Sequence, residues 1–281
     1  MVLDLSKIEV VAGGLDHPEG VACGPDGNLY ATGEAGQVYR ITLPGGKLEQ
    51  FASTGGFGLG LAFDAGCNAY VCDMGVHTVF RVTPDGVATP YATGPRDNPL
   101  VRPNYPVFDA AGNLYVSDSR NWGQDDGLIY KFRPGGEGEV WSAASPAYTN
   151  GMALSPDGTC LYVVETNLPG ISRIAINKDG TAGERSVVMR LPQTLPDGVA
   201  VDVEGKLYVT CYVPDRIYAG APGGVPEILF DDWTRLVLNA PCNIAFAGPG
   251  LSRLAISSLG GWSIAWADVG AAGSPLHYPK V

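Results

Sequence analysis

Four oxygen-bearing side chains occupy the same position of a segment that recurs along the chain. In chain order this position holds Glu19, Leu59, Asn104, Asn150, Asp197 and Cys242. Successive members are 40, 45, 46, 47 and 45 residues apart. A position visited at so regular an interval is one structural site seen once per repeat. The two carboxylates and two amides are therefore expected to converge.

A divalent cation would explain why these residue types meet. Two neighbouring buried carboxylates repel, and one keeps its proton unless a cation lies between them. Carboxylate and amide oxygens are hard ligands, which suit calcium or magnesium. Asn and Asp also cap backbone groups at strand ends, but four such residues at one repeat position disfavour that alternative. The expected ligands are Glu19, Asn104, Asn150 and Asp197.

We expect one divalent cation at this position, with calcium first and magnesium, manganese or zinc as alternatives. Leu59 and Cys242 fill the two remaining places. We expect neither to be a ligand, so the site should be lopsided and leave room for a substrate on one side.

The elements that position these residues are short strands. Each copy of the segment, such as HPEGVACGPDGNLYATG from His17 or RPNYPVFDAAGNLYVSD from Arg102, contains an apolar strand, a tight turn and a second strand. Two further strands follow before the next copy. Four antiparallel strands per roughly 45 residues are typical of the blade of a β-propeller. The sequence therefore predicts an all-β, six-bladed β-propeller that forms a single domain over residues 1–281.

The sixth copy indicates how the ring closes. After WSIAWADV the chain offers no fourth strand, whereas KIEVVAGG near the N-terminus resembles a fourth strand without a blade of its own. We expect this N-terminal strand to complete the last blade, which leaves no open edge between the first and last blades.

Alternation along the innermost strands predicts the surroundings of the site. Two residues after the repeated position lie apolar side chains that should plug the channel: Val21, Leu61, Pro106, Met152, Val199 and Ile244. Two residues before it lie side chains that should surround the opening: His17, Phe57, Arg102, Tyr148, Leu195 and Ala240.

Composition excludes several classes of function. The formal net charge is −11 and no basic stretch is present, which argues against nucleic-acid binding. No apolar run reaches the roughly 18 residues of a membrane span, and no secretory signal is visible. The six cysteines lack C-x-x-C spacing, so we expect reduced thiols in a cytoplasmic protein. The expected partner is a small-molecule substrate, and the sequence does not predict the oligomeric state.

The repeated position and the short sequences around it resemble those of the senescence-marker protein/gluconolactonase/luciferin-regenerating family. These sequences are HPEG, RPN, TNGM and LPDGV. This resemblance implies a six-bladed propeller with an axial divalent cation. It also implies that Glu19, Asn150 and Asp197 are metal ligands. Asn104 matches an asparagine at the edge of the metal that also meets the substrate, and Arg102 matches the arginine two residues before it.

Two departures from the family pattern concern the substrate. Tyr105 and Pro106 stand where sugar-lactone members have Asp-Gly, and the loop after the third copy offers Arg120, Asn121 and Trp122 where sugar-binding members present an acidic side chain. Both departures favour a flatter and less polar substrate than a sugar lactone. The candidate substrate-binding residues are Asn104, Arg102, His17, Tyr105, Trp122 and Tyr148.

The predicted reaction is metal-assisted hydrolysis of a cyclic ester, with Asp197 as the first choice of general base and Glu19 as the second. The alternatives are a phosphotriesterase or esterase of the diisopropyl fluorophosphatase type, a lyase or isomerase on the same scaffold, and a non-catalytic binding propeller. No Gly-x-Ser-x-Gly elbow, Walker loop, dinucleotide fingerprint or His-Glu-x-x-His motif is present.

Overall fold

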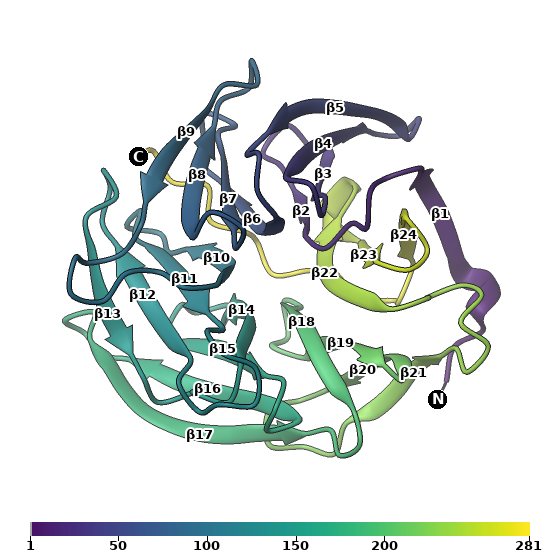
Figure 1. Ribbon diagram of the computed structural model, residues 1–281. Helices are drawn as coiled ribbons and strands as arrows, with labels where there is room; N and C mark the ends of the chain where they lie inside the picture. The colour runs from purple at the N-terminus through teal and green to yellow at the C-terminus, as the bar shows by residue number, and fades with distance from the viewer. Residues whose placement is uncertain (1) are drawn as a thin grey trace.

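The computed structural model, which describes residues 2–281, arranges the strands as six four-stranded antiparallel sheets around a central axis (Figure 1). In the first five sheets the strands pair in chain order, from the innermost strand to the outermost. The predicted six-bladed β-propeller is therefore confirmed, and each sheet is one blade.

The first three blades follow the order in which the chain builds them. Blade 1 contains β2 (Val21–Cys23), β3 (Leu29–Thr32), β4 (Gln37–Thr42) and β5 (Lys47–Ser53). Blade 2 contains β6 (Gly58–Phe63), β7 (Ala69–Asp73), β8 (Thr78–Val82) and β9 (Ala88–Ala92). Blade 3 contains β10 (Pro103–Phe108), β11 (Leu114–Asp118), β12 (Leu128–Phe132) and β13 (Gly138–Ser142).

The last three blades complete the ring. Blade 4 contains β14 (Thr149–Leu154), β15 (Cys160–Glu165), β16 (Gly170–Ile176) and β17 (Ala182–Arg190). Blade 5 contains β18 (Leu195–Val201), β19 (Leu207–Val213), β20 (Asp215–Gly220) and β21 (Glu227–Asp231). Blade 6 contains β22 (Pro241–Ala247), β23 (Arg253–Ser258), β24 (Ser263–Ala267) and the N-terminal β1 (Ile8–Gly13).

The N-terminal strand closes the ring as the sequence predicts. β1 pairs antiparallel with β24, from Ile8 opposite Ala267 to Gly13 opposite Ser263. Both ends of the chain thus contribute to one blade, and the outer edge of β24 is covered rather than left open.

The repeated turn has a side-chain explanation. In blade 5, Asp202 accepts hydrogen bonds from the backbone N–H groups of Glu204 and Lys206, both at 2.9 Å. The same carboxylate accepts a hydrogen bond from the hydroxyl of Tyr208 at 3.1 Å, and Gly205 takes the positive φ of 82° that the turn requires. The Asp and the Tyr of the repeated segment therefore fix the first hairpin together.

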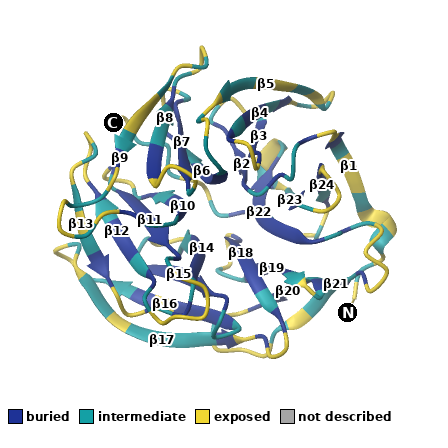
Figure 2. Cartoon of the chain, in the orientation of Figure 1, coloured by how far each residue is buried: buried dark blue, intermediate teal, exposed yellow. Residues whose placement is uncertain are grey.

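The core lies between the blades. Six clusters of buried hydrophobic residues are found among the described residues, and each joins two neighbouring blades. The innermost strands are buried, while the outermost strands β1, β5 and β17 carry many partly or fully exposed residues (Figure 2). Because packing runs around the whole ring, the inner strands are held at fixed positions relative to the axis.

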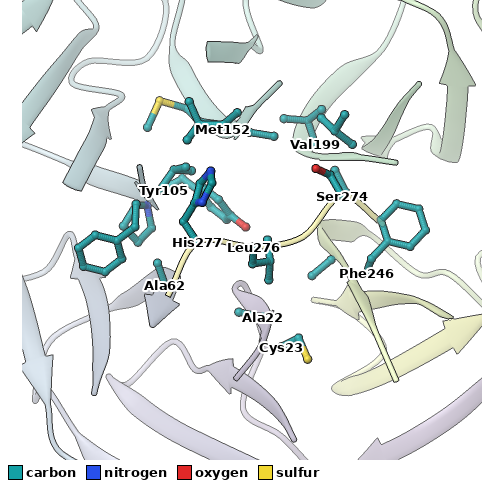
Figure 3. Close-up of a pocket in the computed structure, with 18 of the residues that line it drawn as sticks. Ala22, Cys23, Ala62, Tyr105, Met152, Val199, Phe246, Ser274, Leu276 and His277 are labelled. Atoms are coloured by element: carbon teal, nitrogen blue, oxygen red, sulfur yellow. The ribbon is translucent and has the colours of Figure 1, made fainter. Parts of the chain in front are cut away.

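The C-terminal segment closes one end of the channel. Ser274 donates its backbone N–H to Val201 at 2.9 Å, and the Tyr278 hydroxyl donates to the Cys23 carbonyl at 2.8 Å. Ser274, Leu276 and His277 line a cavity of about 120 Å³ together with the inner-strand ends (Figure 3). This cavity is smaller than the several hundred Å³ that small-molecule sites usually enclose.

Helices contribute little. The described residues contain two single-turn 3-10 segments, η1 (Leu5–Lys7) and η2 (Pro249–Leu251), and no α-helix. Neither segment has the length or apolar character of a helix that crosses a bilayer.

Candidate metal centre

The repeated position converges on the channel axis at the end opposite the C-terminal segment. One ligand-type atom each from Glu19, Asp197 and Cys242 lies within 4.8 Å of the others. Atoms that bind one ion through bonds of about 2.0–2.5 Å must lie within about 5 Å of one another. The Asn150 amide lies beside the Asp197 carboxylate and stabilises its charged form. Residues of blades 1, 4, 5 and 6 are therefore brought together.

Two buried oxygens at this site have no hydrogen-bond partner. Asn150 is 3% exposed, and its Oδ1 is unpaired. Glu19 is partly exposed as a residue, but its Oε2 is shielded from solvent and is also unpaired. A buried polar atom without a partner costs free energy, so these oxygens point to a ligand that the protein itself does not supply.

A hydroxyl group explains which atom of Asn150 remains free. The Nδ2 group of Asn150 donates to the Thr166 hydroxyl at 3.0 Å, and Thr166 donates in turn to the carbonyl of Pro196 at 2.8 Å. The amide nitrogen is thereby fixed on the side of the blade, and Oδ1 is the atom left over. Ser119 holds the Asn104 amide in the same way, at 3.0 Å.

The backbone of the ligand residues is also fixed from the neighbouring blade. The Ser257 hydroxyl donates to the carbonyl of Glu19 at 2.6 Å, and the Thr210 hydroxyl donates to the carbonyl of Cys242. Neither serine nor threonine is among the site residues predicted from the sequence. A pattern in the sequence could have identified them, because a small hydroxyl residue ends the second strand of several blades.

Burial dominates the electrostatics of the site. Desolvation raises the pKa of Glu19, and it raises the pKa of Asp197 well above its usual range, with repulsion from Glu19 as the next cause. Desolvation followed by the charges of Glu19 and Asp197 likewise raises the pKa of the Cys242 thiol. Without a positive charge among them, these groups favour their protonated forms.

The donor set fits a divalent cation. Two carboxylates within 4.8 Å of each other and an unpaired amide oxygen supply the negative charge and the free lone pairs that such an ion requires. The sulfur of Cys242 is the feature that differs from expectation. The expectation of calcium depends on oxygen ligands alone, whereas the structure places a thiol among them.

Glycine follows the repeated position in four blades: Gly20, Gly60, Gly151 and Gly198. Each of these glycines faces the next inner strand. A Cβ on Gly151 would lie 2.6 Å from the Asp197 carbonyl oxygen, and one on Gly20 would lie 2.4 Å from that of Leu59. The close approach of inner strands, and hence of the ligands, therefore requires the absent side chain.

The residues two positions further along plug the channel as predicted. All six are buried: Val21, Leu61, Pro106, Met152, Val199 and Ile244. The candidate metal centre therefore has an apolar floor.

The opening contains a cationic and aromatic group. The Arg102 guanidinium donates to the Tyr148 hydroxyl at 3.0 Å and lies 5.9 Å from the centre of the Tyr148 ring. Trp122, which is 50% exposed, meets Tyr148 edge to face with ring centres 4.7 Å apart. Burial raises the pKa of both Tyr148 and Tyr212, and the charges of Asp197 and Glu19 add to that rise. Arg102, Tyr148, Trp122 and Tyr212 therefore lie toward the centre.

His17 lies at a different part of the opening. Its Nδ1 is 2.8 Å from an Asp16 carboxylate oxygen and 3.1 Å from one of Glu34. Its ring also packs against Trp262, with centres 5.0 Å apart. His17 is thus held by two carboxylates and an indole near the exposed surface.

Tyr105 is placed away from the opening. It is 8% exposed, packs in the core between blades 3 and 4, and lines the cavity at the far end of the channel (Figure 3). Burial raises its pKa to about 12. The strand alternation explains this position, because Tyr105 directly follows Asn104 and must face the other way. We therefore leave Tyr105 out of the substrate-binding set.

The chain matches a known family over most of its length. The family model described as SMP-30/Gluconolactonase/LRE-like region matches residues 33–260, and that of the strictosidine synthase-like N-terminal region matches residues 4–41. Asn104, Asn150 and Asp197 lie in the first range. Glu19 lies in the second.

Curated relatives include two bacterial enzymes. A gluconolactonase of Zymomonas mobilis is 27% identical over 265 residues, which cover 79% of this chain and 72% of that protein. The lactonase drp35 of Staphylococcus epidermidis is 30% identical over 160 residues, which cover 53% of this chain and 48% of that protein.

Solved structures share the fold. A gluconolactonase from Xanthomonas campestris superposes with a TM-score of 0.80 at 21% identity, over 93% of this chain and 89% of that one. Regucalcin from Agrobacterium tumefaciens, described as a calcium-binding protein, superposes with a TM-score of 0.79 at 18% identity, over 96% of both chains. At these identities the likeness concerns the propeller itself.

Proposed function

Because the chain belongs to the SMP-30/gluconolactonase/LRE-like family, we propose that it is a metal-dependent hydrolase that opens a small cyclic ester. The observation that carries this proposal is the pair of unpartnered oxygens, Glu19 Oε2 and Asn150 Oδ1, beside the buried Asp197 carboxylate. The names of the curated relatives, gluconolactonase and lactonase, support the same reaction class.

Glu19, Asn150 and Asp197 would hold the cation, with Asn104 at its edge. When bound, such an ion polarises an ester carbonyl and stabilises the negative charge that develops on its oxygen. The apolar floor below the ligands excludes bulk water from that side of the site. The substrate therefore enters from the face that carries Arg102 and Tyr148, since the C-terminal segment closes the other end.

Asp197 is the proposed general base. Its carboxylate is 6% exposed and lies next to Glu19 rather than to a permanent cationic side chain. Asp197 takes a proton from the attacking water, and the ring oxygen of the lactone leaves as the C–O bond breaks and collects that proton. Glu19 is the second choice for this role.

Arg102, Tyr148 and Trp122 are the proposed substrate contacts. An arginine that donates to a tyrosine hydroxyl is held in place and can donate further N–H groups to an acyl oxygen. The two aromatic rings offer flat apolar contact. This combination favours a lactone with an aromatic or alkyl substituent over one that carries several hydroxyl groups. His17 is the proposed contact on the opposite side, positioned by Asp16 and Glu34.

Chelation and metal add-back test the proposal. Chelator-treated protein is assayed with sugar lactones, alkyl- and aryl-substituted lactones and phosphotriesters, before and after divalent ions are restored. We expect hydrolysis of the substituted lactones that disappears on chelation and returns with metal. Equal turnover with and without chelator would contradict the metal dependence. Turnover of phosphotriesters alone would assign the other hydrolase class.

A further inference from the structure

We propose that Cys242 is itself a metal ligand, and that its sulfur makes the centre prefer a thiophilic divalent ion, such as zinc or cobalt, to calcium. This inference rests on the proposed metal centre and specifies which ion it holds. The first reason is position: the Cys242 sulfur is the third donor atom of the group with Glu19 and Asp197, all within 4.8 Å.

The surroundings of the thiol are those of a ligand rather than a core residue. Cys242 is 1% exposed, and its sulfur lies beside both carboxylates. Its other polar contact is the carbonyl oxygen of Ala240, at 3.5 Å. Leu59 fills the equivalent place in blade 2 with a buried apolar side chain that offers no donor atom. The sulfur therefore lies within reach of any ion that both acids bind.

A second, independent observation indicates that the group binds something. Asn150 is only 3% exposed, so it is more than nine-tenths buried, and its Oδ1 has no hydrogen-bond partner. Thr166 fixes the other atom of that amide, so Oδ1 cannot turn away to another donor without losing the 3.0 Å bond. The amide that carries this unpaired oxygen lies beside the Asp197 carboxylate.

The number and type of donors decide the ion. Calcium takes six to eight oxygen ligands, whereas zinc takes three or four ligands drawn from sulfur, nitrogen and oxygen and keeps an open position in catalytic sites. Here one sulfur and two carboxylates converge from blades 6, 1 and 5, and the Asn150 amide of blade 4 lies beside Asp197 and offers a fourth donor. Sulfur ligands favour zinc and cobalt over hard ions. The donor set is therefore that of a four-ligand mixed site.

Binding replaces the thiol proton. The S–H bond breaks, the proton passes to the buffer, and the sulfur forms the bond to the ion without any change of oxidation state. Neither an oxidant nor a reductant is needed.

Cobalt spectroscopy tests the sulfur ligand directly. Chelator-treated protein receives one equivalent of Co²⁺, the bound ion is counted by dialysis, and the near-ultraviolet absorption is recorded. We expect an intense sulfur-to-cobalt charge-transfer band in the unaltered protein. Cys242→Ser should lack this band. Cys23→Ser, which changes a buried thiol at the far end of the channel, should retain it.

A metal competition gives the second readout. We expect Zn²⁺ and Co²⁺ to raise the melting temperature of the unaltered protein at concentrations at which Ca²⁺ does not. Cys242→Ser should weaken Zn²⁺ binding by more than the 10- to 100-fold that loss of an outer partner costs, with Ca²⁺ affected far less.

The outcomes separate this inference from the proposed function. If one Co²⁺ ion bound per protein molecule without a sulfur-to-cobalt band, the role of Cys242 would be overturned and an oxygen-ligated centre would remain. An unchanged ranking of ions in Cys242→Ser would do the same. If no ion of either class bound, the metal-dependent hydrolase would fail as well. Cobalt bound instead to the second acidic group, which consists of Asp16, His17 and Glu34, would also give no sulfur band and would likewise overturn the role of Cys242.

Discussion

Replacing Asp197 with Asn should stabilise the metal-free protein while removing its response to metal. If both carboxylates were ionised 4.8 Å apart, they would repel by about 3.5 kcal/mol at an effective dielectric constant of about 20, so the chelated protein instead keeps one of them protonated at pH 8, at a free-energy cost of up to about that size. Asn has the same size as Asp but carries no charge, so the cost of burying two acids together disappears. We expect the free energy of unfolding of chelated Asp197→Asn at pH 8 to rise by about 1–3 kcal/mol, or roughly 2–6 °C in melting temperature.

The metal-loaded protein should show the opposite effect. An ion at 100 times its dissociation constant stabilises the unaltered protein by about 2.7 kcal/mol. If the lost ligand weakens binding about 100-fold, the same concentration stabilises the variant by only about 0.4 kcal/mol. Turnover should fall by roughly 10²- to 10⁴-fold, because the variant also lacks the proposed base.

The assay is thermal unfolding with and without metal, together with lactone turnover. Asp202→Asn is the matched control, since Asp202 is also buried and follows the same strand but is fully engaged in its turn. The control should lose stability and keep both the metal response and the activity. Destabilisation of Asp197→Asn in the chelated state, or an unchanged metal response, would refute the reasoning.

Four further outcomes follow from the contacts around the centre. Thr166→Val removes the hydroxyl that orients the neighbouring amide and should weaken metal binding about 10- to 100-fold in a titration. Arg102→Ala should lower kcat/KM by roughly 10- to 100-fold through a lost charged hydrogen bond, with metal affinity unchanged. Ser257→Ala should weaken metal binding because it frees the Glu19 carbonyl, whereas Ser155→Ala at the far end should cost stability alone. The two buried carboxylates have raised pKa values, so they favour folding below their unfolded pKa of about 4 and lose that contribution as pH rises through the folded pKa. The chelated protein should therefore lose stability with rising pH, and the increase in melting temperature on adding metal should grow.

The fold and the identity of the converging residues were accessible to sequence reasoning for a physical reason. A strand alternates its side chains with a period of two, and a blade recurs at a nearly constant interval, so alignment of the copies locates each residue both along and around the axis. Glu19 and Asp197 are 178 residues apart by their numbers, yet their meeting follows from those two periods alone. The role of β1 in closing the ring follows because the last blade has only three strands of its own and the N-terminal strand has no other partner.

Other features depend on contacts that the repeat does not encode. The oxygen of Asn150 is directed by the hydroxyl of Thr166, which holds the other atom of the amide. In blades 1, 3, 5 and 6 the corresponding hydroxyl residue stands two positions earlier in the repeat, so alignment of the copies does not single out Thr166. Cys242 looks like a filler in a column of oxygen donors, because residue type alone does not tell whether a thiol packs or binds. The C-terminal segment that closes the channel has no strand pattern.

The proposed metal centre and the closure of the ring are coupled by the order of the chain. Glu19 belongs to blade 1, whereas Cys242 and the serine that holds the Glu19 carbonyl belong to blade 6. These two blades become neighbours only when β1, which precedes Glu19 by a few residues, pairs with β24. The ligands are therefore complete only in the closed ring. An ion that binds them stabilises the closed ring relative to every open form, so its binding energy contributes to the cooperativity of the whole propeller and not to one blade.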